Sequence, residues 1–328
     1  MNILVTGGAG FIGSTYIRHL LSGRYPGTAG ARVTALDSLT YAGNLANLPV
    51  EDERLTFVKG DIRDLELLLE LLPGHDAVVH FAAESHVDRS LERAAEFVST
   101  NVGGTQTVLE ACLRTGVSRV VHVSTDEVYG SLPRGTASES YPLLPNSPYA
   151  SSKAGADLMV RAYWKTHGLD VSLTRCSNNY GPYQHVEKVI PRFVTNVLEG
   201  RPVPLYGDGR NVRDWLHVDD HCQAVQLVLT GGRAGEIYNI GGGTELTNLQ
   251  LTARILELCG AGWEMVVNVA DRKGHDLRYC VDDSKIRAEL GYAPAAAFDT
   301  GLAETIAWYR DNPSWWKPVK EALPDDRR

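Results

Sequence analysis

The sequence predicts an α/β fold, in which a doubly wound parallel sheet is followed by a smaller, mixed C-terminal domain. Three observations lead to this prediction. Short apolar segments alternate with helix-like segments up to residue 176, a glycine-rich turn joins the first apolar segment to the first helical pattern, and the alternation breaks up after residue 176. Strands separated by helices are typical of βαβ units, whose right-handed crossovers make the strands parallel.

The first half of the chain is predicted to supply most of the sheet. The expected strands are 2–6, 32–37, 55–61, 76–83, 119–124 and 170–176. Helical patterns run to about residue 22, over 64–72, to about residue 115, and over 151–167.

The second half is predicted to be more irregular. Loops rich in Pro, Gly and Asn are expected to dominate 177–215, with helices near 247–259 and 300–311, while the apolar segment 236–240 is expected to rejoin the sheet. We therefore expect a first domain over 1–176, with a returning segment near 214–243, and a second domain formed mainly by 177–328.

Composition restricts the classes of partner. The 328 residues carry a formal net charge of -8 with no basic run, which argues against nucleic acid as a general partner. No apolar run approaches the ~18 residues that a membrane span needs. The cysteines are scattered and odd in number, which favours reduced thiols and a cytoplasmic location; they are Cys112, Cys176, Cys222, Cys259 and Cys280.

The segment "VTGGAGFIGS" directly follows the first predicted strand and opens a helix. Its glycines, Gly7, Gly10 and Gly13, permit a tight turn and close approach of the backbone to a pyrophosphate at a helix N-terminus. Asp37 ends the second strand, where a carboxylate accepts hydrogen bonds from ribose hydroxyls and repels a 2′-phosphate. The pattern therefore predicts a Rossmann-like domain that binds NAD rather than NADP.

Tyr149 and Lys153 lie four residues apart in "SPYASSK", on one face of a predicted helix. A lysine ammonium near a phenol favours the phenolate, so this tyrosine can act as a base near neutral pH. The pair alone is common by chance, but with the glycine loop it makes the sequence similar to the extended short-chain dehydrogenase/reductases.

Further motifs narrow the resemblance. The chain resembles the dTDP-glucose 4,6-dehydratases, NAD-dependent lyases of deoxysugar biosynthesis, from Asn2 to beyond residue 310. The motifs that carry it are "TDEVYG", "SPYASSKAGAD", "RCSNNYGPYQ", "PLYGDG", "RDWLHVDDH", "YNIGGGTELTN" and "DRKGHD". Val186 and Lys273 stand where the family pattern leads us to expect proline.

The triplet Thr125-Asp126-Glu127 discriminates this family from most of its superfamily, which carries a serine and neutral residues there. The resemblance implies that Tyr149 takes the C4 hydroxyl proton during oxidation, with Thr125 bonded to that hydroxyl and Lys153 beside the phenol. It also implies that Asp126 is the acid for the departing C6 hydroxyl and Glu127 the base for the C5 proton. Adjacent carboxyl groups can divide these tasks if their environments separate their pKa values.

The resemblance and the ends of later strands also indicate binding residues. The expected NAD-binding residues are Gly7, Gly10, Phe11, Ile12, Gly13, Asp37, Ser38, Leu39, Thr40, Asp61, Ile62, Phe81, Ala82, Ala83, Ser85, Thr100, Tyr149, Lys153 and Asn179. The expected sugar-nucleotide residues are Ser85, Thr125, Asn178, Lys188, Val189, Pro204, Tyr206, Arg213, Asn248, Arg272 and His275. Lys188, Arg213 and Arg272 suit a diphosphate.

Two further expectations concern metal and assembly. "HVDDH" (217–221) lacks the glutamate of H-E-x-x-H, so we predict no metal there and expect Asp219 or Asp220 to cap the following helix. Apolar faces near 92–115 and 151–167, together with the resemblance, predict a homodimer paired through a four-helix bundle.

Two other functions fit part of the pattern. A nucleotide-sugar 4-epimerase would keep Tyr149 and Lys153 but has no use for Asp126 and Glu127. A non-catalytic NAD-sensing regulator would keep the fold for binding, although such proteins usually lose the Tyr/Lys pair. The resemblance favours dehydration of dTDP-glucose to dTDP-4-keto-6-deoxyglucose, while the residues themselves leave the nucleotide base open.

Overall fold

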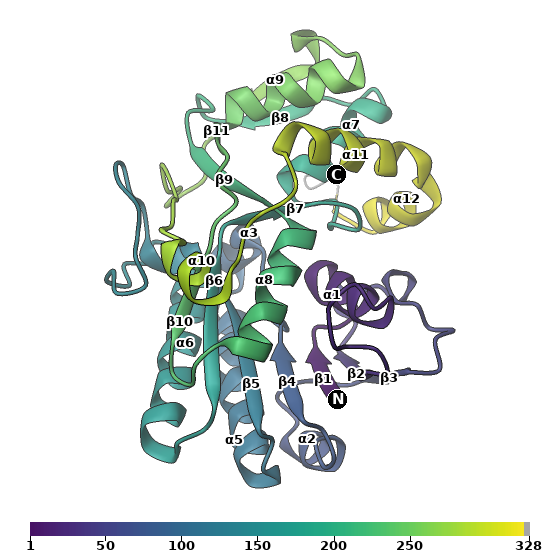
Figure 1. Ribbon diagram of the computed structural model, residues 1–328. Coiled ribbons are helices and arrows are strands. Elements are labelled where there is room, and N and C mark those ends of the chain that lie inside the picture. The colour runs from purple at the N-terminus through teal and green to yellow at the C-terminus, as the bar shows by residue number, and fades with distance from the viewer. Residues whose placement is uncertain (325–328) are drawn as a thin grey trace.

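The computed structural model describes residues 1–324, and its largest element is a seven-stranded parallel sheet with helices on both faces (Figure 1). The strand order is β10-β6-β5-β4-β1-β2-β3. The strands are β1 (Asn2–Thr6), β2 (Arg32–Asp37), β3 (Leu55–Lys59), β4 (Ala77–His80), β5 (Arg119–Thr125), β6 (Val171–Cys176) and β10 (Ile237–Ile240). The chain order reverses between β1 and β4, the place where open parallel sheets bind ligands. The predicted doubly wound α/β fold is confirmed.

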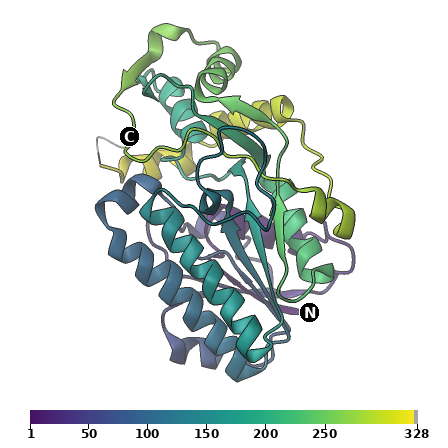
Figure 2. The same cartoon turned by 90° about the vertical axis from the view of Figure 1, so that its left-hand side faces the viewer.

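Alternation along the strands gives the sheet two buried faces, each with its own core. Ile3 and Val5 of β1 face one core, and Leu4 between them faces the other. The first core is covered by α1 (Phe11–Leu21), α8 (Val218–Gly231) and α10 (Ser284–Leu290). The second is covered by α2 (Leu65–Leu71), α5 (Thr105–Thr115) and α6 (Pro148–His167). Figure 2 shows two long helices of this second face, α5 and α6, side by side.

The segment between β4 and β5 is more broken than the single helix predicted from the sequence. It contains α3 (Val87–Glu92), α4 (Ala94–Phe97), a π-helical stretch, η2 (Val98–Gly104), and then α5. The π-helical stretch packs against α6 so closely that a Cβ on Gly155 would lie 3.0 Å from Val102 Cγ2. Gly155 therefore has a structural role within α6, the helix that also carries Tyr149 and Lys153.

A second layer lies beyond the carboxyl edge of the sheet and has its own apolar core (Figure 1). Its helices are α7 (Val189–Leu198), α9 (Asn248–Cys259), α11 (Phe298–Asp311) and α12 (Pro313–Glu321). Its strands form two small sheets, β11 (Glu245–Thr247)-β9 (Val212–His217)-β7 (Asn178–Tyr180) and β12 (Val266–Val269)-β8 (Val203–Tyr206). Three short 3₁₀ helices complete the fold: η1 (Leu45–Asn47), η3 (Asp126–Tyr129) and η4 (Trp263–Met265).

The prediction that loops dominate 177–215 is wrong, because this stretch contains β7, α7, β8 and most of β9. The strands are only three to six residues long; β9 and β8 pair with the later strands β11 and β12, and β7 pairs with β9. Short strands of this kind have too few residues to show a period. The apolar face of α7 gives this stretch a helical period, but Pro191 in the first turn of the helix interrupts the pattern.

The expected cap of the helix after "HVDDH" is also wrong. The N-cap of α8 is His217, whose side chain accepts a hydrogen bond from the backbone N–H of Asp219. Asp220 is buried and instead accepts from the backbone N–H groups of Ala295 and Ala296, both at 3.0 Å. Asp219 pairs with Arg24 near the surface. Nothing local in the sequence marks residues 295 and 296 as the partners of Asp220.

Two features of the described residues concern the expectations about membrane spans and metal sites. None of the helices within residues 1–324 is long and apolar enough to cross a membrane. In the same part of the chain, no group of three or more His, Cys, Asp or Glu side chains is placed to hold a metal ion. All five cysteines are free.

Asp220→Ala is expected to lower the free energy of unfolding by about 2–4 kcal/mol, because two sheltered N–H groups lose a charged acceptor. Asp299→Ala serves as the control, since its side chain is 77% exposed and its ion pair with Arg254 is worth about 1 kcal/mol or less. Urea unfolding followed by tryptophan fluorescence measures both. Equal losses in the two variants would contradict the role given to Asp220.

Candidate active site

Two adjoining cavities, of about 320 and 160 Å³, lie where the carboxyl edge of the sheet meets the second layer. The larger follows the ends of β1, β2, β4, β5 and β6, and the smaller is lined mainly by residues of α7, β8, β9 and the 271–279 segment. Glu127, Asn178 and Lys188 line both cavities. The arrangement can therefore bring two molecules together at these three side chains.

The glycine loop forms one end of the larger cavity, and a side chain at either of two of its glycines would clash with the backbone. Gly7 has a φ of +67°, and a Cβ there would lie 2.7 Å from the backbone nitrogen of Ala82. A Cβ on Gly13 would lie 2.3 Å from the carbonyl oxygen of Gly7. Helix α1 begins directly after Gly10, with its N-terminus toward the cavity. This cradle fits the pyrophosphate of a dinucleotide.

Asp37 lies beside the glycine loop at the end of β2. Its carboxylate accepts hydrogen bonds from the backbone N–H groups of Ala9, at 3.0 Å, and Leu39, at 2.8 Å. Burial raises the pKa of Asp37, and these backbone hydrogen bonds act in the opposite direction. The carboxylate is thus fixed at the cavity wall, where a ribose hydroxyl can reach it.

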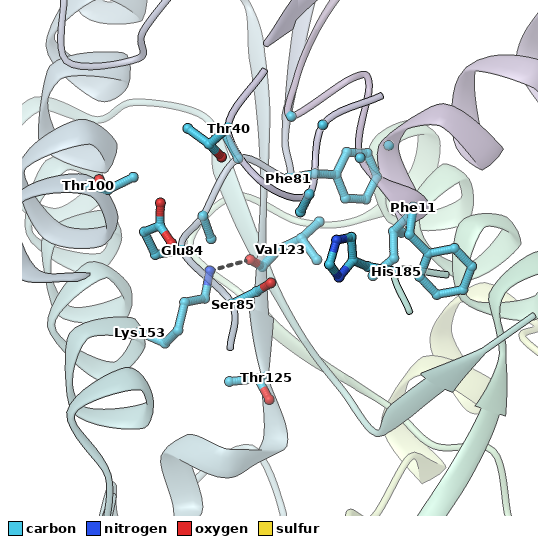
Figure 3. Close-up of a pocket in the computed structure, with 18 of the residues that line it drawn as sticks. Phe11, Thr40, Phe81, Glu84, Ser85, Thr100, Val123, Thr125, Lys153 and His185 are labelled. Carbon is cyan, nitrogen blue, oxygen red and sulfur yellow. Dashed lines mark hydrogen bonds between the residues drawn. The ribbon is translucent and has the colours of Figure 1, made fainter. Parts of the chain in front are cut away.

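The structure brings almost all of the expected NAD-binding residues into the larger cavity, including Asp61, Ile62, Thr100 and Asn179. Figure 3 shows several of them, with Phe11, Thr40, Phe81 and Ser85 labelled. Leu39 is the exception. Its side chain packs against the core on the α1 face instead, and its backbone has a φ of 54°.

Tyr149 and Lys153 project into the same cavity from the first turns of α6. The helix begins at Pro148, three residues earlier than predicted, with Ser147 as N-cap. The Tyr149 side chain forms a hydrogen bond with Thr125. Lys153 Nζ donates to the backbone carbonyl of Val123 at 2.8 Å (Figure 3). Phenol, ammonium and threonine hydroxyl are therefore held together at the end of β5.

The electrostatics of Tyr149 differ from the simple expectation that Lys153 favours a phenolate. Burial raises the pKa of Tyr149 well above its usual value, and the negative charge of Glu127 raises it further. Burial also lowers the pKa of the Lys153 ammonium, an effect that Asp157 opposes. The protein alone therefore keeps the phenol protonated, and added positive charge beside it would be needed to lower its pKa.

Asp126 and Glu127 form the first turn of η3, capped by Thr125. Asp126 is 2% exposed, and its Oδ2 has no hydrogen-bond partner among the described residues. Burial raises the pKa of Asp126 well above its ordinary value, and the charges of Glu127 and Asp214 raise it further. This shift favours the protonated form of Asp126, which an acid requires.

Glu127 has a different charge environment from its neighbour. Burial raises its pKa too, but three cations oppose that effect: Arg213, Lys188 and Arg272. These cations favour the carboxylate form, which a base requires. The pKa values of the two adjacent groups are therefore separated in the direction that an acid and a base need.

The smaller cavity gathers those same three cations, each held by a separate anchor. Lys188 Nζ donates to the carbonyl of Ser85 at 2.7 Å, and Arg213 Nη2 donates to the carbonyl of Asp276 at 3.1 Å. Arg272 forms a two-point ion pair with Asp88, at 2.5 and 2.8 Å. Such a cluster suits a diphosphate, which carries several negative charges.

The remaining expected sugar-nucleotide residues are also brought together. Asn178, Val189, Pro204, Tyr206, Asn248 and His275 line the smaller cavity with Arg213 and Arg272, while Ser85 and Thr125 line the larger one. Of the two departures from the family pattern, Val186 is 1% exposed and belongs to the core of the second layer, so it acts through packing.

Several lining residues escaped the sequence prediction. Cys176 and His185 line the larger cavity, and Asp88 and Tyr279 the smaller one. Cys176 ends β6 at the same sheet edge as Thr125, so its place at a strand end was a usable signal. Asp88 lies three residues beyond the predicted Ser85, but its pairing with Arg272 spans 184 residues and has no local signature.

Comparison with known proteins gives a consistent family. Residues 4–305 match the family model described as GDP-mannose 4,6 dehydratase. A dTDP-glucose 4,6-dehydratase of Streptomyces niveus is 60% identical over 328 residues, 99% of this chain and 97% of the relative.

Solved structures agree with the sequence relatives. A dTDP-glucose 4,6-dehydratase from Streptomyces venezuelae with NAD bound has a TM-score of 0.96 and 64% identity, and the match covers 97% of this chain and 100% of that one. A UDP-glucose 4-epimerase from Thermotoga maritima is more distant, with a TM-score of 0.88 and 31% identity over 95% of this chain and 100% of that one. By sequence, fold and cavity geometry, the chain belongs to the dTDP-glucose 4,6-dehydratase family of extended short-chain dehydrogenase/reductases.

Proposed function

We infer that this chain catalyses the NAD-dependent dehydration of dTDP-glucose to dTDP-4-keto-6-deoxyglucose, a reaction of deoxysugar biosynthesis. The observation that carries this inference is the meeting of a dinucleotide cavity and a cationic cavity at Glu127, directly beside Asp126, whose pKa burial raises. Relatives named for this reaction, at 60% identity, support the choice of substrate.

The cofactor cavity fits NAD because Gly7 and Gly13 leave room for a pyrophosphate and Asp37 offers a carboxylate to a ribose. When bound there, NAD supplies a positively charged ring that accepts a hydride from C4 of the sugar and later returns it to C6. Lys153 lies in the same cavity and contributes a second positive charge next to Tyr149.

Oxidation at C4 requires the removal of the hydroxyl proton, and Tyr149 is the group that we assign to it. Thr125 lies beside the phenol and lines the same cavity, so both hydroxyl groups can reach the sugar hydroxyl. Positive charge beside the phenol opposes the effect of burial and lowers the pKa of Tyr149 toward the range where it acts as a base.

Loss of water across C5–C6 follows, because a ketone at C4 makes the C5 proton acidic. Glu127, which faces three cations, removes that proton, and Asp126, which burial keeps protonated, gives its proton to the departing C6 hydroxyl. Lys188, Arg213 and Arg272 hold the diphosphate, so that the hexose extends toward these acids.

A 4-epimerase is the second candidate, because the Thermotoga maritima epimerase shares this fold. That reaction uses oxidation and reduction at C4 and needs no acid and base at C5–C6. Incubation with dTDP-glucose separates the possibilities. We expect a 4-keto sugar that absorbs in alkali, whereas an epimerase would yield the C4 epimer and a non-catalytic regulator would yield neither.

We also propose which part of the chain binds each ligand and in which compartment the protein works. Residues 1–176, with the returning segment 214–243, hold NAD, and residues 177–328 hold mainly the nucleotide sugar. Free cysteines, three of them buried, support a reducing compartment such as the cytoplasm.

The carboxylate variants are expected to fail at different steps. In deuterated water, Asp126→Asn retains the base but lacks the acid, so it should introduce deuterium at C5 of recovered hexose faster than it dehydrates. Glu127→Gln lacks the base and should do neither, with turnover lowered by about 10²–10⁴. Mass spectrometry of recovered sugar measures the exchange. Equal deuterium incorporation by both variants would overturn the assignment of acid and base.

A homodimer formed through α6 and its neighbours is the expected assembly. Leu158 on α6 and Val98 on η2 are 57% and 55% exposed, on elements that pack against each other. Leu158→Arg should therefore shift the mass in light scattering from that of two chains to that of one. Val267→Arg, at an apolar position of β12 that is 48% exposed, is the control and should remain dimeric. A wild-type monomer at micromolar concentration would rule out the assembly.

A further inference from the structure

Arg89, on the short helix α3, joins two distant segments that line the larger cavity. Its guanidinium carbon lies 3.8 Å from the ring centroid of Tyr41, and its Nη2 and Nε donate to Glu187 Oε2 at 2.9 and 3.2 Å. Tyr41 lies between the lining residues Thr40 and Ala42. Glu187 lies directly before Lys188, which lines both cavities.

The joined segments also touch each other directly. The rings of Tyr41 and His185 meet edge to face, with centroids 5.7 Å apart. Burial, together with the charges of Lys188 and Arg89, lowers the pKa of His185 to about 4, so this ring is neutral near pH 7. The backbone N–H of Glu187 accordingly donates to His185 Nδ1 at 3.4 Å. Figure 3 shows the His185 ring near Phe11 within the cavity.

The contact between Arg89 and Glu187 is sheltered from water. The Glu187 side chain is 2% exposed and that of Arg89 is 22% exposed. An ion pair in such a place holds its geometry, because the loss of one partner leaves the other charge buried. Arginine is suited to the position, since its planar group can stack on a ring and form ion-pair hydrogen bonds at the same time.

Backbone conformation indicates that both segments are held by their surroundings. Leu39 and Tyr183, one near each joined residue, have φ values of 54° and 68°, which side chains other than glycine rarely adopt. Conformations of this kind persist where neighbouring contacts impose them. The contacts of Arg89 with Tyr41 and Glu187 are among those that connect the two segments.

We propose that Arg89 is a positioning residue that clasps the 38–43 segment to the 184–188 segment and thereby retains NAD between turnovers. The proposal rests on the proposed function, in which one cofactor molecule is used and restored within each cycle. Release of NAD requires the cavity wall to open, and the clasp joins two parts of that wall. Loss of the clasp should therefore accelerate dissociation of NAD without removing a group that takes part in the chemistry.

Arg89→Met tests the clasp, because it keeps an unbranched apolar stem and removes the charge and planar group. Exchange of bound NAD against isotopically labelled NAD should become about tenfold faster or more. Turnover at saturating NAD should stay within about threefold of the wild type, while the KM for NAD rises. Arg93→Met is the matched control, since Arg93 is 68% exposed and its 3.6 Å ion pair with Glu96 lies at the surface; its exchange rate should not change.

Two conservative variants test the clasp independently of Arg89→Met. Arg89→Lys keeps a charge opposite Glu187 but cannot stack as a planar group, so its exchange rate should fall between those of the wild type and Arg89→Met. Tyr41→Phe keeps the ring and should retain NAD, whereas Tyr41→Ala should release it. These Tyr41 variants leave the buried Arg89–Glu187 pair intact, so they test the clasp even if Arg89→Met folds poorly.

The outcomes distinguish this proposal from the function on which it rests. A desalted wild-type protein without bound NAD would count against the proposed cofactor. A wild type that holds NAD, with Arg89→Met and Tyr41→Ala exchanging it at the same rate, would overturn the clasp alone. A variant that loses turnover at saturating NAD in proportion to a lower melting temperature would show that Arg89 is merely structural, which also overturns the clasp.

Discussion

The site depends on one constraint, that two adjacent carboxyl groups must hold different protonation states. Asp126 is buried, and the charges of Glu127 and Asp214 add to the effect of burial on its pKa, while Arg213 offsets only part of it. Glu127, one residue later, faces Arg213, Lys188 and Arg272. The short 3₁₀ turn after β5 allows this separation, because consecutive side chains on a tight turn point in different directions. Acid and base are thus separated by environment rather than by residue type.

The second layer is required for that separation. The three cations come from elements beyond the sheet, and each is anchored by a different part of the chain, such as Ser85 for Lys188 and Asp88 for Arg272. Anchoring fixes the cations before a diphosphate arrives, so less side-chain freedom is lost on binding. The same cations that suit the nucleotide therefore favour the ionised form of the base. Recognition and chemistry are linked through Glu127, which lines both cavities.

The fold alone does not decide the reaction. A UDP-glucose 4-epimerase superposes with a TM-score of 0.88 at 31% identity, so the sheet, the glycine cradle and the two-layer arrangement can support another chemistry. What distinguishes the present chain is the composition of a single turn at the end of β5. Because β5 lies inside the sheet, strands on both sides hold the end from which this turn projects.

The sequence by itself determined the parallel sheet, the glycine loop, the Tyr149/Lys153 pair and the acidic triplet, because each depends on residues that are close in the chain. Only the tertiary structure decided how the second layer forms, since β7, β8 and β9 are short and pair with distant segments. It also decided that His217 caps α8, that Leu39 packs into the core, and that Asp88 holds Arg272. The pKa order of Asp126 and Glu127 belongs to this second group, because burial and charge depend on neighbours that no local pattern contains.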